Sequence, residues 1–251
     1  MFKKTILTLT VALAGFTVAS AQTNLQVFYD FGRKHVTTTL EGFYNDNWGN
    51  TFFFIDYDFN NKVDGKIISP NNTYFEIARC LNFWHSVPVL SDFSLQVEYN
   101  GGFGTWGSVD SSKIGGVDYG AFPVNSAFLF GIDYFIHSKD YKNTLNLKLL
   151  YKQFIGLKSN VPLQFTAVWG LQDLFTLKGL RFSGFVDVWC EGSNVVVLSE
   201  PQLWYNIGGL FGCPNLNLGG EVELSYNFAG LENTTGKKFN VLPCLGAKWV
   251  F

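Results

Sequence analysis

Carboxylates and aromatic rings share one side of a two-residue alternation in this sequence. The early members are Phe28, Asp30, Glu41, Phe43, Phe52, Phe54 and Asp56, and later segments add Glu98, Arg181, Asp187 and Glu221. A ring on a polar face can stack on a flat solute, and base–aromatic stacking is worth roughly 1–3 kcal/mol. Carboxylates beside the rings can accept hydrogen bonds from the hydroxyl and amino groups of the same solute. The pattern predicts a weak, fast-releasing site for a small polar solute.

The elements that carry these side chains are short segments of alternating apolar and polar residues, separated by Gly, Asn, Asp and Pro. Twelve are expected, near residues 25–32, 35–45, 49–59, 72–81, 92–101, 123–136, 143–154, 161–171, 179–190, 194–206, 215–227 and 238–251. Such segments of about ten residues are typical of transmembrane barrels. The sequence therefore predicts an all-β fold, a twelve-stranded antiparallel transmembrane β-barrel.

The N-terminus predicts export. Lys3 and Lys4 precede a mostly apolar run, and residues 19–21 (Ala-Ser-Ala) form a small-residue cleavage pattern. The run is too short for a membrane-spanning helix, which needs roughly 20 apolar residues. We expect a signal peptide over residues 1–21 and a single mature domain over residues 22–251. No cysteine follows the cleavage site, so a lipid anchor is not expected.

Composition limits the possible partners. Without Lys3 and Lys4 the 18 basic residues fall to 16, against 20 acidic residues, and none are clustered. Nucleic acid is therefore not an expected partner. Aromatic residues make up 18% of the chain, which includes 26 Phe. A soluble domain could hardly bury so many rings, whereas a protein facing lipid need not.

The four cysteines, Cys80, Cys190, Cys213 and Cys244, are widely spaced and include no C-x-x-C pair. This spacing predicts no metal or redox site, and no cofactor is expected. An exported chain permits disulfides, so simple packing and one incidental bridge both remain possible.

The C-terminal segment indicates the location of the barrel. Alternate positions back from Phe251 are apolar as far as Phe239. A lipid-facing row that ends on an aromatic residue resembles the assembly signal of outer-membrane barrels. The expected location is the outer membrane of a Gram-negative bacterium, with lipid and the barrel-assembly machinery as partners. A soluble secreted β-sandwich is the alternative, but it would leave these apolar rows exposed to water.

The parity of the strands predicts which connections are extracellular. An even number of strands places both termini in the periplasm. Connections after odd-numbered strands are then extracellular, and the two longest, residues 102–122 and 60–71, fall on that side. The periplasmic connection over residues 82–91 is longer than is typical.

Two questions about the interior remain open from the sequence. The rings can simply fill a narrow lumen instead of binding a solute. Glu76 and Arg79 have opposite parity, so a regular strand cannot turn both inward. Either a bulge corrects this, or Arg79 lies at the membrane interface.

Three segments resemble the nucleoside-specific Tsx-like channels, and in particular a little-characterised branch grouped with them. They are WGNTFFFIDY (48–57), YFEIAR (74–79) and LQVEYNGG (95–102). The resemblance implies a monomeric twelve-stranded barrel whose narrow, aromatic-lined lumen passes nucleosides. It also implies that Phe52, Phe54 and Asp56 belong to the solute path, with Glu76, Arg79 and Glu98 as polar partners.

Two other functions compete with a channel. An enzyme is not expected, because the three histidines, His35, His85 and His137, fall at strand ends or turns and no G-x-S-x-G motif occurs. A non-conducting barrel that acts as an adhesin, a receptor or a structural element is the alternative that fold alone does not exclude. Conductance separates it from a channel.

Overall fold

The computed structural model describes residues 21–63, 66–69, 71–109 and 117–251. The predicted signal peptide lies almost wholly outside the described residues. The strands are β1 (Ala21–Asp30), β2 (His35–Asp46), β3 (Gly49–Phe59), β4 (Asn61–Val63), β5 (Lys66–Ser69), β6 (Asn72–Leu81), β7 (Phe93–Val109), β8 (Val117–His137), β9 (Asn143–Phe154), β10 (Leu163–Gln172), β11 (Leu180–Glu191), β12 (Asn194–Ser199), β13 (Gln202–Asn206), β14 (Leu216–Tyr226) and β15 (Phe239–Val250). Within these residues the connections contain three short helices, namely η2 (Leu174–Thr176), η3 (Gly208–Leu210) and α2 (Glu232–Thr235).

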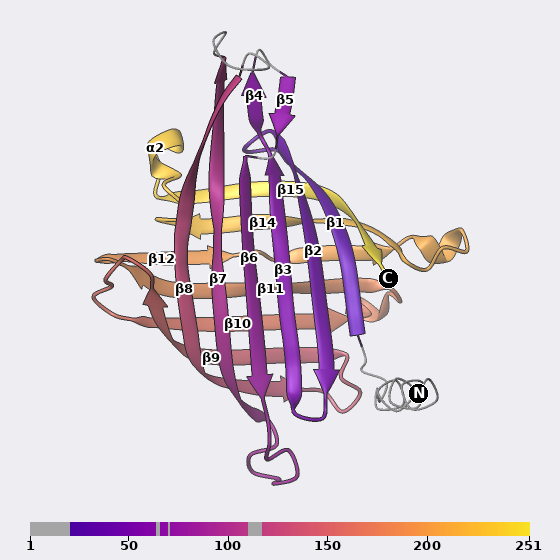
Figure 1. Cartoon of the computed structure of the whole chain (residues 1–251). Helices are drawn as coiled ribbons and strands as arrows, with labels where there is room; N and C mark the ends of the chain where they lie inside the picture. The colour runs from indigo at the N-terminus through magenta and orange to yellow at the C-terminus, as the bar shows by residue number, and fades with distance from the viewer. Residues whose placement is uncertain (1–20, 64–65, 70, 110–116) are drawn as a thin grey trace, which may run out of the picture.

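The sheet closes on itself between its first and last strands. β1 pairs antiparallel with β15, from Asn24 opposite Val250 to Asp30 opposite Cys244. β12 and β13 both lie between β11 and β14, so together they take the place of one strand in the barrel wall. Pro201 lies at the interruption and has no N–H group to donate. The predicted closed, twelve-stranded antiparallel barrel is confirmed, and Figure 1 shows its two walls crossing steeply.

All twelve predicted segments are strands, but the predicted loop over residues 102–122 is wrong. β7 continues to Val109 and β8 begins at Val117, so the described part of this segment is a long paired hairpin. Its glycines provide space for rings. A Cβ atom at Gly104 would lie 2.2 Å from the Phe122 ring, and one at Gly120 would lie 2.3 Å from the Trp106 ring. A glycine-rich stretch can therefore be a strand where rings lie flat on it.

The connections differ in size at the two ends of the barrel. The β4–β5 hairpin and the extension of β7 and β8 project from the end opposite the chain termini (Figure 1). This arrangement agrees with the parity argument, and the assignment of that end to the cell exterior stays a prediction. The residue 82–92 connection lies at the same end as the termini.

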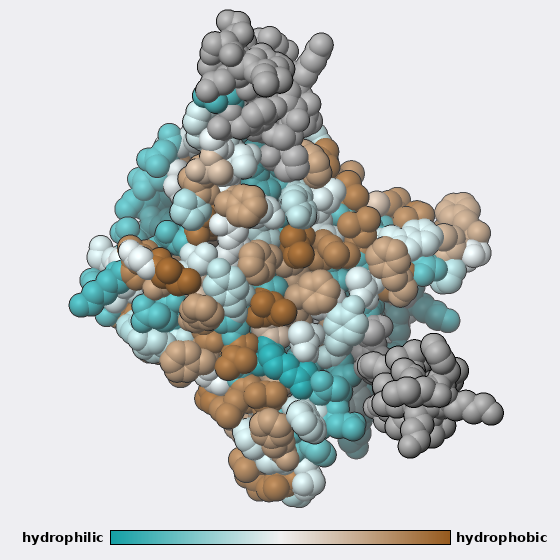
Figure 2. All heavy atoms as spheres, viewed as in Figure 1, coloured by the Kyte–Doolittle hydropathy of each residue, from teal (hydrophilic) through white to brown (hydrophobic). Residues whose placement is uncertain are grey.

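The outer wall is apolar, whereas the alternate residues of each strand face the lumen. On β1, Leu25, Val27 and Tyr29 are exposed. Similar exposed residues occur around the barrel, including Leu95, Val97, Phe128, Phe130, Ile132, Leu149, Phe165, Leu203, Leu218 and Val241. Apolar side chains gather across the middle of the visible wall in Figure 2. Among the described residues, no helix is long and apolar enough to cross a membrane.

Part of the interior is packed with apolar side chains. We call Ala127, Leu129, Leu150, Phe154, Trp189 and Val196 the inner apolar cluster. Leu157 and Phe228, from two connections at the end opposite the termini, pack against it. The inner apolar cluster therefore narrows the lumen on the β8–β12 side. The four cysteines are free.

Candidate functional site

An aromatic row lines the lumen on two neighbouring strands. The β3–β6 register places Phe54 opposite Glu76 and Asp56 opposite Tyr74. The ring centroids of Phe52 and Phe54 are 6.1 Å apart, and those of Phe54 and Tyr74 are 5.9 Å apart. We call Phe52, Phe54 and Tyr74 the aromatic row. All three side chains are half-buried, so their ring surfaces are only partly covered by protein.

Carboxylates flank this row, and protein donors hold them in place. The Thr39 hydroxyl donates to Asp56 at 2.5 Å. The Tyr74 hydroxyl donates to Glu76 at 2.7 Å, and the Gln96 amide donates to Glu98 at 2.7 Å. These bonds leave further lone pairs on each carboxylate to accept from a solute.

Charges from the far wall interact with the same carboxylates. Asp187 on β11 accepts from Thr166 at 2.5 Å and is close enough to Glu76 for their charges to repel. Lys152 on β9 interacts favourably with Glu76, Glu98 and Asp187. Carboxylates of β6, β7 and β11 therefore face the same part of the lumen as Lys152 of β9.

Lys152 is held by rings as well as by charge. Its Nζ atom lies 4.3 Å from the centroid of the Trp189 ring and 5.1 Å from that of Phe154. The same atom donates to Gln164 Oε1 at 2.7 Å. Lys152 therefore joins the inner apolar cluster to the charged part of the lumen, since cations are attracted to ring faces.

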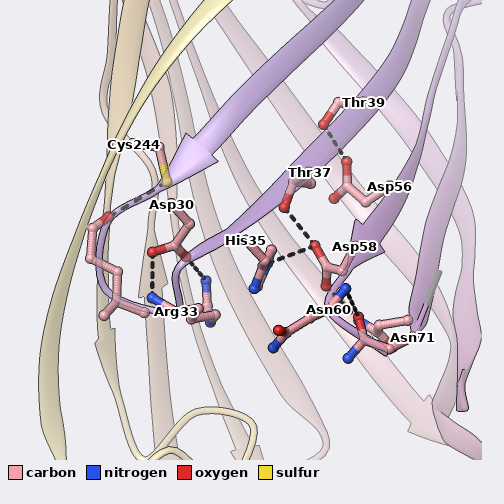
Figure 3. A network of polar contacts seen from close by, with 12 residues as sticks. Asp30, Arg33, His35, Thr37, Thr39, Asp56, Asp58, Asn60, Asn71 and Cys244 are labelled. Atoms are coloured by element: carbon pink, nitrogen blue, oxygen red, sulfur yellow. Dashed lines mark hydrogen bonds and ion pairs between the residues drawn. The ribbon is translucent and has the colours of Figure 1, made fainter. Parts of the chain in front are cut away.

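A second polar network lies at the same end of the barrel as the β1–β2 turn, on β2, β3 and β6 (Figure 3). His35 Nε2 lies 3.3 Å from Asp58 Oδ1. The Thr37 hydroxyl donates to Asp58 at 2.6 Å, and the Asn72 amide donates to its other oxygen at 3.2 Å. This network holds the C-terminal end of β3 in place, and with it the position of Asp56, two residues before Asp58.

Arg33 extends from the β1–β2 turn toward the mouth of the lumen at this end. Its Nη1 atom donates to Asp30 at 2.8 Å, and its Nη2 atom forms a short ion pair with Glu223 on β14. Burial lowers the pKa of Arg33, but the Glu223 and Asp30 carboxylates outweigh this effect, so the pKa of Arg33 is raised. The guanidinium stays charged and links two strands across β15.

The remaining predicted site residues take different places. Phe28 is 2% exposed and packs on Trp204 at 5.5 Å, so this ring fills the lumen, as the alternative interpretation held. Phe43 is 38% exposed, and Glu41 accepts from Asn24 at 2.8 Å. The buried Nε atom of Arg181 has no hydrogen-bond partner among the described residues. Glu221 accepts from Gln202 at 2.9 Å.

The assignment of Arg79 to the solute path is wrong. β6 pairs regularly with both of its neighbours, so Arg79 faces outward and Glu76 faces inward. Arg79 donates to Asp46 at 2.8 Å and to Thr51 at 3.1 Å, at the end of the strand. The strand end provides partners for its charge, so no bulge is needed.

Sequence reasoning missed two contributors to this lumen. Tyr74 has the parity of Glu76, and applying the alternation to β6 would have found it. Arg33 lies in a turn, where alternation predicts no direction, so no sequence signal could have placed its guanidinium. Among the described residues, no group of three or more His, Cys, Asp or Glu is arranged to hold a metal ion.

Comparisons with known proteins identify a family but no function. A family model described as a domain of unknown function, DUF5020, matches residues 21–251. No curated protein matches the sequence.

Solved structures similar to this one include several barrels. Acinetobacter baumannii outer membrane protein Omp33 is 7% identical with a TM-score of 0.40, and the match covers 93% of this chain and 98% of that one. Pseudomonas putida OprB is 10% identical (TM-score 0.36, coverage 100% and 98%), as is a Rhodopseudomonas blastica porin mutant (0.36, 93% and 100%). At such TM-scores the similarity supports no conclusion about function. None of the three is named as a Tsx-like channel, so that resemblance stays a prediction.

Proposed function

This chain belongs to the DUF5020 family, and we propose that the protein is a channel in the outer membrane of a Gram-negative bacterium. The channel would pass small polar solutes, nucleosides among them. The proposal takes the barrel as a monomer and includes no catalytic step. Uptake would be passive and weakly selective.

The apolar outer wall supports the membrane location. A closed sheet pairs every backbone group, which a bilayer requires of any spanning structure. Exposed apolar rows of this extent would be unfavourable on a soluble protein. Lipid is therefore the partner that suits the outer wall.

The proposed solute class rests on the aromatic row and the carboxylates beside it. Phe52, Phe54 and Tyr74 are half-buried in the lumen beside Asp56 and Glu76. Rings of this kind can stack on a flat base. The carboxylates can accept hydrogen bonds from ribose hydroxyls and base amino groups. A sugar of similar size lacks the aromatic face and would gain only the second interaction.

Planar bilayers test this proposal directly. We expect small single-channel steps, which added nucleoside reduces and a sugar of similar size does not. Complete electrical silence of correctly folded protein would remove the channel function. Equal block by the sugar would remove the nucleoside preference alone.

The double substitution Phe52→Ala with Phe54→Ala should weaken nucleoside block by at least about tenfold, because each lost stacking contact is worth roughly 1–3 kcal/mol. The measurement is the concentration of nucleoside that halves the conductance. Phe53→Ala is the matched control, since Phe53 lies on the outer face and stacks on Tyr44 at 6.0 Å. Both proteins should keep heat-modifiable gel mobility. Unchanged block in the double variant would exclude the aromatic row as the binding surface.

The inner apolar cluster favours a second candidate, a non-conducting barrel. Leu129, Leu150 and Val196 are almost completely buried inside the wall, which narrows any path along β8 to β12. Such a barrel would act as a structural or receptor protein of the membrane. It differs from the channel in giving no conductance steps at any solute concentration.

The C-terminal strand is also proposed as the signal for the barrel-assembly machinery. The Phe251 side chain is 68% exposed, while its backbone N–H donates to Thr23 at 2.9 Å beside the β1–β15 closure. Deleting Phe251 should reduce insertion by the machinery several-fold, because the terminal ring is free to be bound. Phe251→Tyr should retain insertion, and both proteins should refold in detergent. Normal insertion of the deletion protein would rule out this role.

A further inference from the structure

Carboxylates gather around Arg33 at the mouth of the lumen beside β1 and β14. Asp30, Glu221 and Glu223 face the lumen from β1 and β14, and Glu200 joins them from the β12–β13 link. The charges of Glu200, Glu221 and Glu223 interact with one another. We call these four carboxylates with Arg33 the Arg33 site. Lys248 also interacts with Glu221, but its Nζ atom is held 4.3 Å from the Trp204 ring centroid.

One oxygen of this site has no partner. Glu223 Oε2 pairs with Arg33, whereas Glu223 Oε1 is buried and accepts no hydrogen bond within the described part of the chain. The Glu223 side chain is only 7% exposed. A buried carboxylate oxygen without a donor costs free energy, so the site is incomplete for a cationic or hydrogen-bond-donating group.

The turn beneath Arg33 is fixed, but its guanidinium is not enclosed. Phe31 donates its backbone N–H to Pro243 at 3.1 Å, and Lys34 donates to the Asp30 carbonyl at 2.8 Å. The Arg33 side chain is 30% exposed, whereas the Asp30 side chain with which it pairs is only 2% exposed (Figure 3). The side chain can therefore swing outward without unfolding the turn.

Arg33 itself shows which cation suits the site. Its two terminal nitrogens reach two carboxylates on different strands, Asp30 through Nη1 and Glu223 through Nη2. A planar, forked cation matches such a pair better than a point charge does. No metal-binding group of three or more ligands occurs among the described residues, which favours an organic cation.

We propose that the Arg33 site binds small solutes that carry a guanidinium group, and that Arg33 occupies it as a tethered counter-ion until such a solute displaces it. The inference rests on the proposed channel function in one respect, namely that the solute enters the barrel mouth to reach the site. It gives the channel a cationic solute class in addition to flat, neutral solutes.

Binding of agmatine to the folded barrel in detergent, measured by calorimetry, tests the proposal. Arg33→Ala should bind agmatine at least about tenfold more tightly than the unmodified protein, because a tethered competitor acts at millimolar effective concentration. Arg33→Ala with Glu223→Gln should lose this gain. Lys142→Gln should change nothing, since Lys142 pairs with Asp173 in exposed connections at the end of the barrel near the termini.

Guanidinium ion and urea provide a matched second measurement. Arg33→Ala leaves Asp30 and Glu223 uncompensated, so its thermal midpoint should fall. Guanidinium at low millimolar concentration should restore it, whereas urea, similar in shape and uncharged, should not. If Arg33→Ala folds only when guanidinium is present, the proposal is equally supported. Arg33→Lys should bind agmatine with an affinity between the two proteins.

The results that overturn the proposal are equal agmatine affinity with and without Arg33, or equal rescue by urea and guanidinium. Failure of Arg33→Ala to fold even with guanidinium, together with unchanged affinity in Arg33→Lys, would also overturn it. These measurements do not need conductance. A barrel that binds agmatine but is electrically silent would therefore remove the channel function and leave this site standing.

Discussion

Replacing Lys152 with methionine is expected to lower the free energy of unfolding of the barrel by about 3–5 kcal/mol, the cost of removing one partner from a buried charge cluster. Methionine keeps most of the side-chain volume, so packing against Trp189 is largely preserved. The change leaves the repulsion among Glu76, Glu98 and Asp187 less compensated. Gln164 Oε1 also loses its donor.

Urea titration followed by heat-modifiable gel mobility measures this loss. Lys142→Met is the matched control, because the same substitution there breaks an exposed ion pair with Asp173. Exposed pairs contribute roughly 0–1 kcal/mol. If both variants unfold at the same urea concentration, the lumen is wet enough to screen Lys152, and its proposed role in charge balance fails.

Replacing Trp189 with alanine is expected to destabilise the barrel by about 3–5 kcal/mol and to enlarge its lumen, because a large buried ring is removed. Trp189 belongs to the inner apolar cluster and is in edge contact with Phe228 at 6.1 Å. Its loss also removes the ring face under Lys152. If the barrel conducts, single-channel steps should become larger.

Trp48→Ala is the control for this prediction, since Trp48 is exposed in the turn between β2 and β3. It should leave both stability and step size close to those of the unmodified protein. A Trp189→Ala barrel that is destabilised yet has unaltered steps would place the conducting path elsewhere. A barrel that is silent before the substitution and conducts after it would show that the cluster is a plug.

The alternation of side chains made most of the fold predictable. Because successive residues on a strand face opposite sides, polar positions such as Gln26 and Asp187 could be assigned inward before any pairing was known. The closing pair of strands was predictable for the same reason, since the row ending at Phe251 fixes the parity of β15. The predicted strand over residues 194–206 is divided into β12 and β13 at Pro201. The break does not change which of its residues face inward.

Errors arose where a side chain's environment depends on distant residues. The family resemblance predicts Arg79 in the solute path, but the Arg79 guanidinium forms an ion pair with Asp46 on β2. The sequence predicts a connection over the Gly- and Ser-rich segment 102–122, yet its glycines make room for the rings of Trp106 and Phe122. Such compensation is visible only when both strands are in place.

The sequence by itself determined the barrel, its strand count and the face on which nearly every side chain lies, since these depend on a period of two along the chain. Only the tertiary structure decided what the inward side chains do. It separated rings that fill space, such as Phe28 on Trp204, from the half-buried aromatic row, and it brought Arg33 to Glu223 from 190 residues away. The physical reason is that parity is a local property, whereas contact across a lumen depends on strand tilt, register and turn geometry together.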